Sequence, residues 1–145
     1  MTQIDFYTHA EDKLETACRV AAKAMQQGMR VMLLTADASA TERLDRLLWT
    51  LPPTGFIPHC RAGSPLAGVT PVIIDHLEDV LVHDGVLVNL RDEWPACFSR
   101  FQRLVEIVGT DEADRKAGRD RFRFYRDRGY EIRHHDLRGG ATGPA

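Results

Sequence analysis

The chain has 145 residues, of which 43% are hydrophobic and 28% are charged, an ordinary composition for one soluble globular domain. It has no apolar run near the roughly 20 residues that a membrane helix needs, and its first residues lack the basic start and apolar core of a signal peptide. Its three scattered cysteines fit a reduced compartment better than a disulfide framework. These features count against a membrane or disulfide-stapled protein and predict a cytoplasmic domain.

Charge is distributed unevenly along the chain. Nine basic and four acidic residues lie from Arg115 to the end, whereas residues 1–114 carry ten basic and seventeen acidic residues. The net charge of −2 therefore combines a balance of +5 near the C-terminus with −7 elsewhere. This asymmetry predicts one local site for an anionic partner on a body that repels anions elsewhere.

Strands and helices are predicted to alternate through the first half of the chain. A helical spacing of apolar residues over 13–27 stops at Gly28, and Pro52-Pro53 ends a second helix that Asp37 or Ser39 can cap. The unbroken apolar run Val31-Met32-Leu33-Leu34 is typical of a strand buried on both faces. The predicted elements are a strand at 4–7, a helix at 13–27, a strand at 30–35 and a helix reaching about residue 51.

The second half continues the alternation after a Gly- and Pro-rich stretch, 55–70, that we expect to be irregular. Asp111 can cap a long helix that runs to about Arg128 and stops at Gly129. Strands are predicted at 72–75, 86–90, 104–108 and 130–137, with a helix or turn at 92–100. The pattern predicts a single α/β domain over residues 1–138 with a mostly parallel sheet, followed by a flexible tail at 139–145.

Signatures of nucleotide enzymes are missing from the sequence. The connection after the first strand contains Glu11 and Asp12 but no glycine, and no P-loop lysine follows. Asp75 ends an apolar strand as in some magnesium sites, but without a P-loop that interpretation is disfavoured. The pairs His59-Cys60 and His134-His135 lack any CxxC or HExxH context. We therefore expect no catalytic residues, no metal and no cofactor.

The predicted helix over 115–128 interleaves arginines with aromatic residues. At about 100° per residue, five side chains share an arc of roughly 100°: Arg115, Arg119, Phe122, Arg123 and Arg126. Ala117 and Phe124 point nearly opposite and, with part of Tyr125, are predicted to face the core. Phe122 is therefore an aromatic residue inside an arginine stripe.

Phe122 allows more than one interpretation. It can cap the edge of the core beneath a solvated arginine face. Alternatively, the stripe can bind single-stranded nucleic acid, with bases stacked on Phe122, or a peptide that ends in a hydrophobic residue and a free carboxylate. The acidic remainder of the chain favours a short anionic peptide over a long nucleic-acid track.

Short motifs in order along almost the whole chain resemble the chi subunit of bacterial DNA polymerase III holoenzyme. They comprise Phe6-Tyr7, Gly28-Met29-Arg30-Val31, Arg43-Leu44-Asp45, Leu48-Trp49, Phe56-Ile57-Pro58-His59, Pro71-Val72 and the segment from Arg119 to Gly129. The resemblance implies a three-layer, Rossmann-like α/β fold without nucleotide chemistry. It also implies a non-catalytic adaptor of the clamp loader that meets DNA only indirectly.

Members of this family bind the acidic C-terminal tail of single-stranded DNA-binding protein, which ends in a phenylalanine carboxylate. By position, the resemblance gives Arg119 the terminal carboxylate and gives the upstream acids to Arg115 and Arg123. It lines the pocket for the terminal phenylalanine with Trp49, Val108, Phe122, Gly118 and Tyr125.

A second surface of the family binds the psi subunit, which joins chi to the clamp loader. Phe56, Ile57 and Pro58 form an apolar loop that is a candidate for this interface, although Phe56 and Ile57 can equally be core residues. Direct binding of single-stranded nucleic acid by the basic helix remains the alternative function. An enzyme of nucleotide metabolism on the same scaffold is a third and weaker one.

Overall fold

The computed structural model describes residues 1–50 and 57–139, and residues 51–56 and 140–145 lie outside the described part. The described strands form one sheet of seven in the order β3-β4-β2-β5-β6-β1-β7, and every neighbouring pair is parallel. The α/β domain predicted from the alternating pattern is confirmed. The strands are β1 Gln3–Thr8, β2 Val31–Leu34, β3 His59–Arg61, β4 Val72–Asp75, β5 Val86–Asn89, β6 Arg103–Ile107 and β7 Ile132–Asp136.

Three α-helices of the described part begin at aspartates that cap them. The helices are α1 Lys13–Gln26, α2 Ala38–Thr50 and α3 Glu112–Asp127. The Asp12 carboxylate accepts the backbone N–H of Glu15 at 3.1 Å, and Asp111 accepts that of Asp114 at 2.8 Å. Each cap satisfies one of the backbone donors that a helix start leaves unpaired. The predicted helices and their starts are confirmed.

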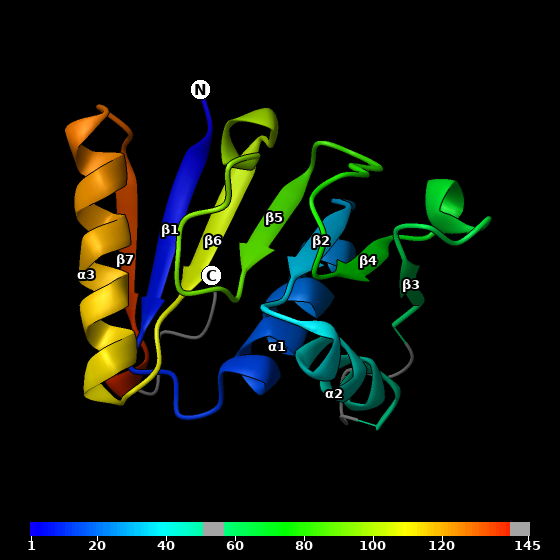
Figure 1. The fold of residues 1–145 in the computed structure, drawn as a ribbon, viewed down its shortest axis with the longest axis horizontal. Helices are drawn as coiled ribbons and strands as arrows, with labels where there is room; N and C mark the ends of the chain where they lie inside the picture. The colour runs from blue at the N-terminus through cyan, green and yellow to red at the C-terminus, as the bar shows by residue number, and fades with distance from the viewer. Residues whose placement is uncertain (51–56, 140–145) are drawn as a thin grey trace.

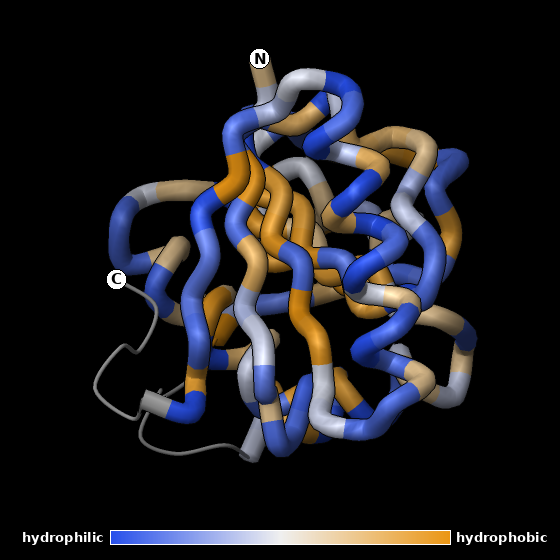
Figure 2. The backbone as a smooth tube through the Cα atoms, turned by 90° about the vertical axis from the view of Figure 1, so that its left-hand side faces the viewer, coloured by the Kyte–Doolittle hydropathy of each residue, from blue (hydrophilic) through white to orange (hydrophobic). Residues whose placement is uncertain are grey.

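The helices cover both faces of the sheet and so make three layers. Helices α1 and α2 pack on one face, against side chains such as Leu33, Ile74 and Ile107. Helix α3 packs on the other face, where Tyr125 contributes to a core with Phe6 and Leu104. Figure 1 shows α3 beside β7 at one edge, with α2 and β3 toward the other. Figure 2 shows the hydrophobic segments gathered in the central strands and the hydrophilic ones on the outer turns.

The chain reverses its direction of winding at β1 and β6, which are neighbours in the sheet. The C-terminal end of β1 leads into α1 on one face, whereas the end of β6 leads into α3 on the opposite face. In open α/β sheets, the crevice at the carboxyl ends of strands that diverge in this way is where ligands bind. The fold therefore points to the region around His9 and Gly109.

Three local predictions differ from the structure. The segment 55–70, expected to be irregular, includes strand β3 and the 3-10 turn Ala67–Val69, because a three-residue strand is too short to carry a pattern. The predicted core face of α3 is confirmed for Tyr125, which is buried, and Phe124 packs beside it at the margin of the core. The prediction missed Asp114, Gly118 and Arg121, which are the other buried residues of the helix. Gly139, predicted to begin the tail, ends the 3-10 turn Leu137–Gly139, and the rest of that tail lies outside the described residues.

Candidate functional site

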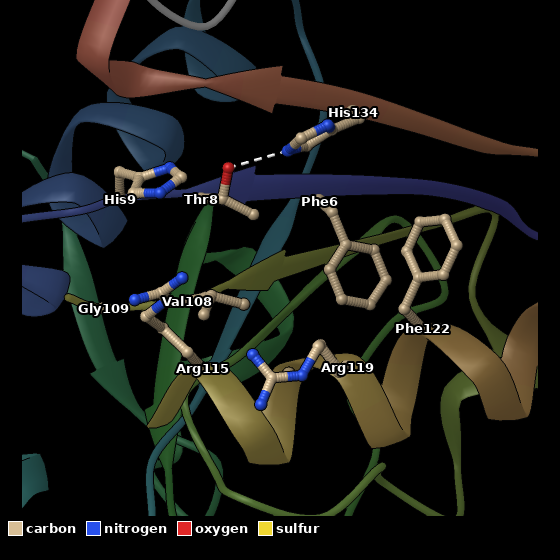
Figure 3. Close-up of a pocket in the computed structure, with 10 residues that line it drawn as sticks. Phe6, Thr8, His9, Val108, Gly109, Arg115, Arg119, Phe122 and His134 are labelled. Carbon is tan, nitrogen blue, oxygen red and sulfur yellow. Dashed lines mark hydrogen bonds between the residues drawn. The ribbon is translucent and has the colours of Figure 1, made fainter. Parts of the chain in front are cut away.

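A pocket of about 350 Å³ opens at the predicted crevice, between the ends of β1 and β6, strand β7 and helix α3. Its lining combines apolar side chains, two histidines and two arginines: Phe6, Thr8, His9, Val108, Gly109, Arg115, Gly118, Arg119, Phe122 and His134. Figure 3 shows the arginines on α3 facing Thr8, His9 and His134 across the opening. Five residues predicted for the peptide site from the family resemblance thus lie together: Val108, Arg115, Gly118, Arg119 and Phe122.

The apolar part of the pocket is formed by Phe6 from β1, Val108 from the end of β6 and Phe122 from α3. The Phe122 ring meets Phe6 edge-on, with ring centroids 5.3 Å apart and planes at 67°. Phe122 is half-buried at the margin of the core, so the stripe aromatic contributes both to the core and to the pocket. This wall can accept one apolar side chain of a ligand.

Gly118 sets how closely α3 approaches this wall. A Cβ atom at position 118 would lie 2.7 Å from Cγ2 and 3.0 Å from Cγ1 of Val108. Because such contacts are too short for real Cβ atoms, only glycine permits the observed packing of α3 on the end of β6. Gly118 therefore shapes the pocket without offering a side chain.

The wall opposite the arginines is polar. The Thr8 hydroxyl lies 2.7 Å from Nε2 of His134, and His9 Nδ1 lies 3.2 Å from Asp136. Hydrogen bonds from Arg138 lower the pKa of Asp136, so that carboxylate stays charged beside His9. His9 itself has a φ of 61°, an uncommon conformation for a residue other than glycine. Sequence reasoning missed both histidines as pocket residues.

Two arginines mark the rim of the pocket, and both remain largely exposed. The side chains of Arg115 and Arg119 are 48% and 55% exposed, and both lie within 4 Å of the Glu112 carboxylate. Arg123, predicted to meet upstream acids, lies 3.6 Å from Asp120 and outside the pocket lining. The rim is therefore positive but already carries acidic neighbours.

Tyr125, which the resemblance places in the predicted site, is a core residue. Its side chain is fully buried, and its hydroxyl donates a hydrogen bond to Glu106 Oε2 at 2.6 Å. Burial, with a further contribution from the Glu106 charge, raises the pKa of Tyr125 far above its usual range. Tyr125 thus supports the pocket from behind and has no surface to offer a ligand.

Trp49, which the resemblance places in the peptide pocket, is not among the residues that line this pocket. Trp49 lies on α2, which packs on the face of the sheet opposite α3, and its side chain is 59% exposed. Its ring meets His59 edge-on at a centroid distance of 5.0 Å. Trp49 therefore lies near Pro58, in the region predicted for the psi interface.

That second surface is described only in part. Ile57 is fully buried in the core beside α1 and α2, so its side chain is not available to a partner. Pro58 is half-buried, and Phe56 lies outside the described residues. Of the three candidates for this interface, Pro58 is the described residue that is partly accessible.

A larger groove of about 720 Å³ lies on the α1 side of the same crevice. Lys13, Arg43 and Arg46 line it, but so do four acids, Glu11, Asp12, Asp37 and Asp111. The aspartates at 12, 37 and 111 also accept backbone N–H groups at the starts of the three helices. Because the helix starts are already occupied by carboxylates, this groove does not favour an anion.

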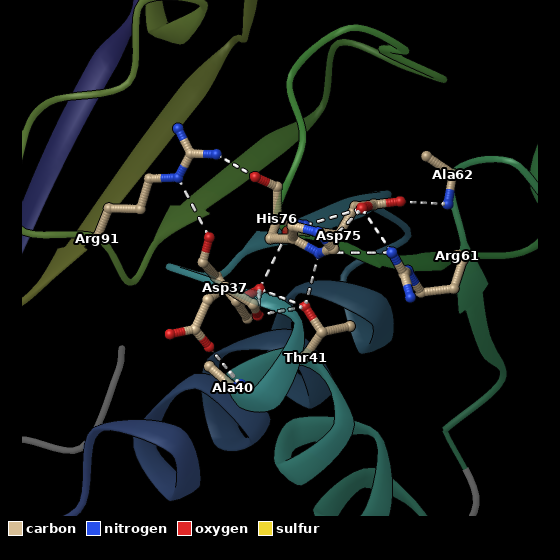
Figure 4. Close-up of polar contacts among 9 residues, drawn as sticks. Asp37, Ala40, Thr41, Arg61, Ala62, Asp75, His76 and Arg91 are labelled. Atoms are coloured by element: carbon tan, nitrogen blue, oxygen red, sulfur yellow. Dashed lines mark hydrogen bonds and ion pairs between the residues drawn. The ribbon is translucent and has the colours of Figure 1, made fainter.

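Asp75, considered from the sequence as a magnesium ligand, is hydrogen-bonded by donors of the protein. Its carboxylate accepts Arg61 Nη2 at 3.0 Å and the backbone N–H groups of Ala62 and His76 at 3.2 and 2.8 Å, as Figure 4 shows. These hydrogen bonds outweigh burial and lower the pKa of Asp75. Within the described residues, no three His, Cys, Asp or Glu side chains gather as a metal site.

None of the helices in the described part of the chain is long and apolar enough to span a bilayer.

Comparison with known proteins places the chain in one family. Residues 1–133 match the family described as DNA polymerase III chi subunit, HolC. The DNA polymerase III subunit chi of Pseudomonas aeruginosa is 39% identical over 94% of this chain and 98% of its own length. Those of Escherichia coli and Haemophilus influenzae are each 28% identical over 81% of this chain, covering 81% and 83% of their own lengths.

The resemblance noted in the sequence is thereby confirmed. It extends over almost the whole length of the Pseudomonas relative. The chain belongs to the family of DNA polymerase III chi subunits, which are accessory subunits of DNA replication.

Proposed function

We propose that this chain is a non-catalytic, cytoplasmic adaptor of the replisome that captures the acidic C-terminal tail of single-stranded DNA-binding protein. The observation that carries this proposal is the pocket of about 350 Å³ in which an apolar wall meets two exposed arginines. A ligand that ends in an aromatic side chain and a free carboxylate has both complementary parts in one residue.

The proposed ligand places its terminal ring against Phe6, Val108 and Phe122 and its terminal carboxylate at Arg119. Burial of one aromatic side chain contributes roughly 1.5–3 kcal/mol. A charge-assisted hydrogen bond contributes about 1.5–3 kcal/mol more, and exposed acids near Arg115 and Arg123 about 0–1 kcal/mol each. After the cost of association, these contributions correspond to a micromolar complex.

The same contacts argue against the nucleic-acid alternative. The exposed arginines of α3 have acidic neighbours on the same helix: Glu112 beside Arg115 and Arg119, Asp120 beside Arg123, and Asp127 beside Arg126. A phosphate backbone that follows the stripe meets these carboxylates at every turn, whereas a short peptide meets only the rim.

Titration of the folded chain with synthetic peptides tests the proposal. An acidic peptide ending in Phe with a free carboxylate should bind, and the same peptide with an amidated end should bind at least tenfold more weakly. Arg119→Ala should lose the free-acid peptide, whereas Arg126→Ala, an exposed arginine of α3 outside the pocket, should retain it. Added salt should weaken binding because the rim charges are exposed.

Equal affinity of Arg119→Ala and the unchanged chain for the free-acid peptide would refute the assignment of the site. An oligothymidylate control distinguishes the alternative function. If the chain binds the oligonucleotide with a steep salt slope and ignores the peptide, direct nucleic-acid binding is the better description.

We further propose that the surface around Trp49 and Pro58 contacts the psi subunit of the clamp-loader complex. Trp49 is a largely exposed aromatic residue, and interfaces are enriched in such side chains. It lies on α2, across the sheet from α3, so one chain can hold both partners at once. Trp49→Ala should abolish co-purification with a psi subunit while leaving peptide binding unchanged. If Trp49→Ala lost both psi co-purification and peptide binding, the proposal of two independent surfaces would be refuted.

A further inference from the structure

Glu112 stands at the rim of the pocket and is shared by both rim arginines. Its Oε1 lies 3.2 Å from Arg119 Nη2, and its Oε2 lies 3.8 Å from Arg115 Nη1. The Glu112 side chain is 75% exposed, so water surrounds the carboxylate on its outer side. The two cations that line the pocket thus already hold one carboxylate from their own helix.

The spacing of this contact is unusual within α3. Glu112 lies three residues before Arg115 and seven before Arg119, so it reaches across two turns of the helix. Arg126, which lies outside the pocket, pairs instead with the adjacent Asp127 at 3.2 Å. An exposed pair of this kind is weak, so a stronger acceptor can displace Glu112 from Arg119.

We infer that Glu112 is a specificity-determining residue of the pocket, an internal competitor that a ligand carboxylate must displace from Arg119. This inference rests on the proposed function, because it concerns the same pocket and the same class of ligand. A ligand that offers Arg119 only a carboxylate exchanges one such group for another and gains little. A ligand that also buries an apolar side chain against Phe6 and Phe122 gains what Glu112 cannot supply.

Glu112 also acts against unwanted ligands by its charge. A polyanion at the rim brings its negative groups close to the exposed Glu112 carboxylate. It gains no apolar contact in the pocket that would offset this repulsion. Repulsion of wrong partners is a common means of specificity alongside attraction of the right one. Glu112 therefore weakens the binding of every anion at the rim. Only a ligand that also has an apolar end gains enough from the pocket to bind.

The test compares Glu112→Gln with Asp127→Asn, which removes the same charge from the same helix away from the pocket. The probes are an acidic peptide ending in Phe with a free carboxylate and the same peptide with an amidated end. Glu112→Gln should tighten the free-acid peptide about two- to fivefold, the range that exposed ion pairs supply. It should tighten the amidated peptide no more than Asp127→Asn does.

In an Arg119→Ala background, the gain from Glu112→Gln for the free-acid peptide should disappear, because the competition takes place at Arg119. An equal gain in that background would show a general charge effect and overturn the inference. So would an unchanged or weaker affinity of Glu112→Gln itself.

A readout without any peptide keeps the inference separate from the proposed function. In the unliganded chain, Glu112→Gln should shift the Nε–Hε resonance of Arg119 and speed its exchange with water, whereas Asp127→Asn should not. If no variant binds peptide, the proposed function fails and this resonance alone decides the Glu112–Arg119 contact. An unchanged Arg119 resonance overturns the inference whatever the peptides do.

Discussion

Arg119 and Arg121 lie two residues apart on α3 and have opposite environments. The Arg121 side chain is 1% exposed and its Nε donates to Glu106 Oε1 at 2.9 Å, whereas Arg119 is more than half exposed at the rim of the pocket. Two residues turn a helix by about 200°, so one arginine faces the sheet and the other faces solvent. The pair shows that position relative to the sheet, not residue type, decides what an arginine of this helix does.

The buried side of α3 fixes the helix on which the exposed side depends. Glu106 on β6 is fully buried and accepts hydrogen bonds from Arg121, from the Tyr125 hydroxyl and from Asn89 Nδ2. Arg121 Nη1 also donates to the backbone carbonyl of Asp92 at 2.6 Å. These bonds join α3 to β5 and β6 and hold the pocket residues of the same helix in register.

The largest expected effect comes from the buried arginine. Arg121→Ala leaves the Glu106 charge buried without its cationic partner, which typically costs about 3–5 kcal/mol of stability. Urea unfolding followed by circular dichroism measures the loss. A cost below about 1 kcal/mol, comparable to a surface substitution, would contradict the structural role of this pair.

The Arg121→Ala defect should also depend on pH. Burial raises the pKa of Glu106, and Arg121, Tyr125 and Asn89 oppose that rise. Without the guanidinium, the pKa of Glu106 rises further, so the folded state binds a proton more tightly than the unfolded state.

A carboxyl whose pKa is raised in the folded state adds to the free energy of unfolding at low pH, where it is protonated. It loses this contribution as the pH rises through its folded-state pKa. The stability gap between Arg121→Ala and the unchanged chain should therefore narrow as pH falls from about 8 to about 5. Urea midpoints across that range give the measurement. A gap that stays constant or widens toward low pH would show that Arg121 does not hold down the pKa of Glu106.

Gly118→Ala tests the close contact between α3 and Val108 at the end of β6. The added methyl meets Val108 Cγ2 at 2.7 Å, and overpacking of this kind costs about 1–3 kcal/mol despite the better helix propensity of alanine. Binding of the Phe-ending peptide should fall as well, because Val108 lines the pocket.

Val108→Ala in the same chain should relieve the clash and recover part of the stability. If Gly118→Ala is more stable than the unchanged chain, the approach of α3 to β6 is looser than the structure indicates.

The smallest effect is expected on the exposed side. Arg119→Ala should change the free energy of unfolding by less than about 0.5 kcal/mol, because its pair with Glu112 is exposed. Arg126→Ala serves as the matched exposed arginine and should behave alike. The same urea titration used for Arg121→Ala provides the comparison, and an Arg119 cost approaching that of Arg121 would remove the distinction between the two sides.

The sequence predicted part of the site and missed the rest for definite physical reasons. Arg115, Arg119 and Phe122 were identified from the arginine stripe as well as from the family resemblance, whereas Val108 and Gly118 came from the resemblance alone. The resemblance also placed Trp49 in the pocket, but Trp49 is absent from its lining because α2 packs on the face of the sheet opposite α3. His9 and His134 carry no local pattern, and they reach the pocket because β1 and β7 are neighbours in register.

By itself, the sequence determined the alternation of helices and strands, the aspartate caps and the concentration of positive charge at the C-terminal helix. These features depend on contacts between residues close in the chain, which composition and spacing record. Only the tertiary structure decided which arginine is buried with Glu106, which faces a ligand, and that Trp49 lies across the sheet. Those outcomes depend on the packing of α3 against strands distant in sequence, and the rotation of that helix is set by contacts that no local pattern contains.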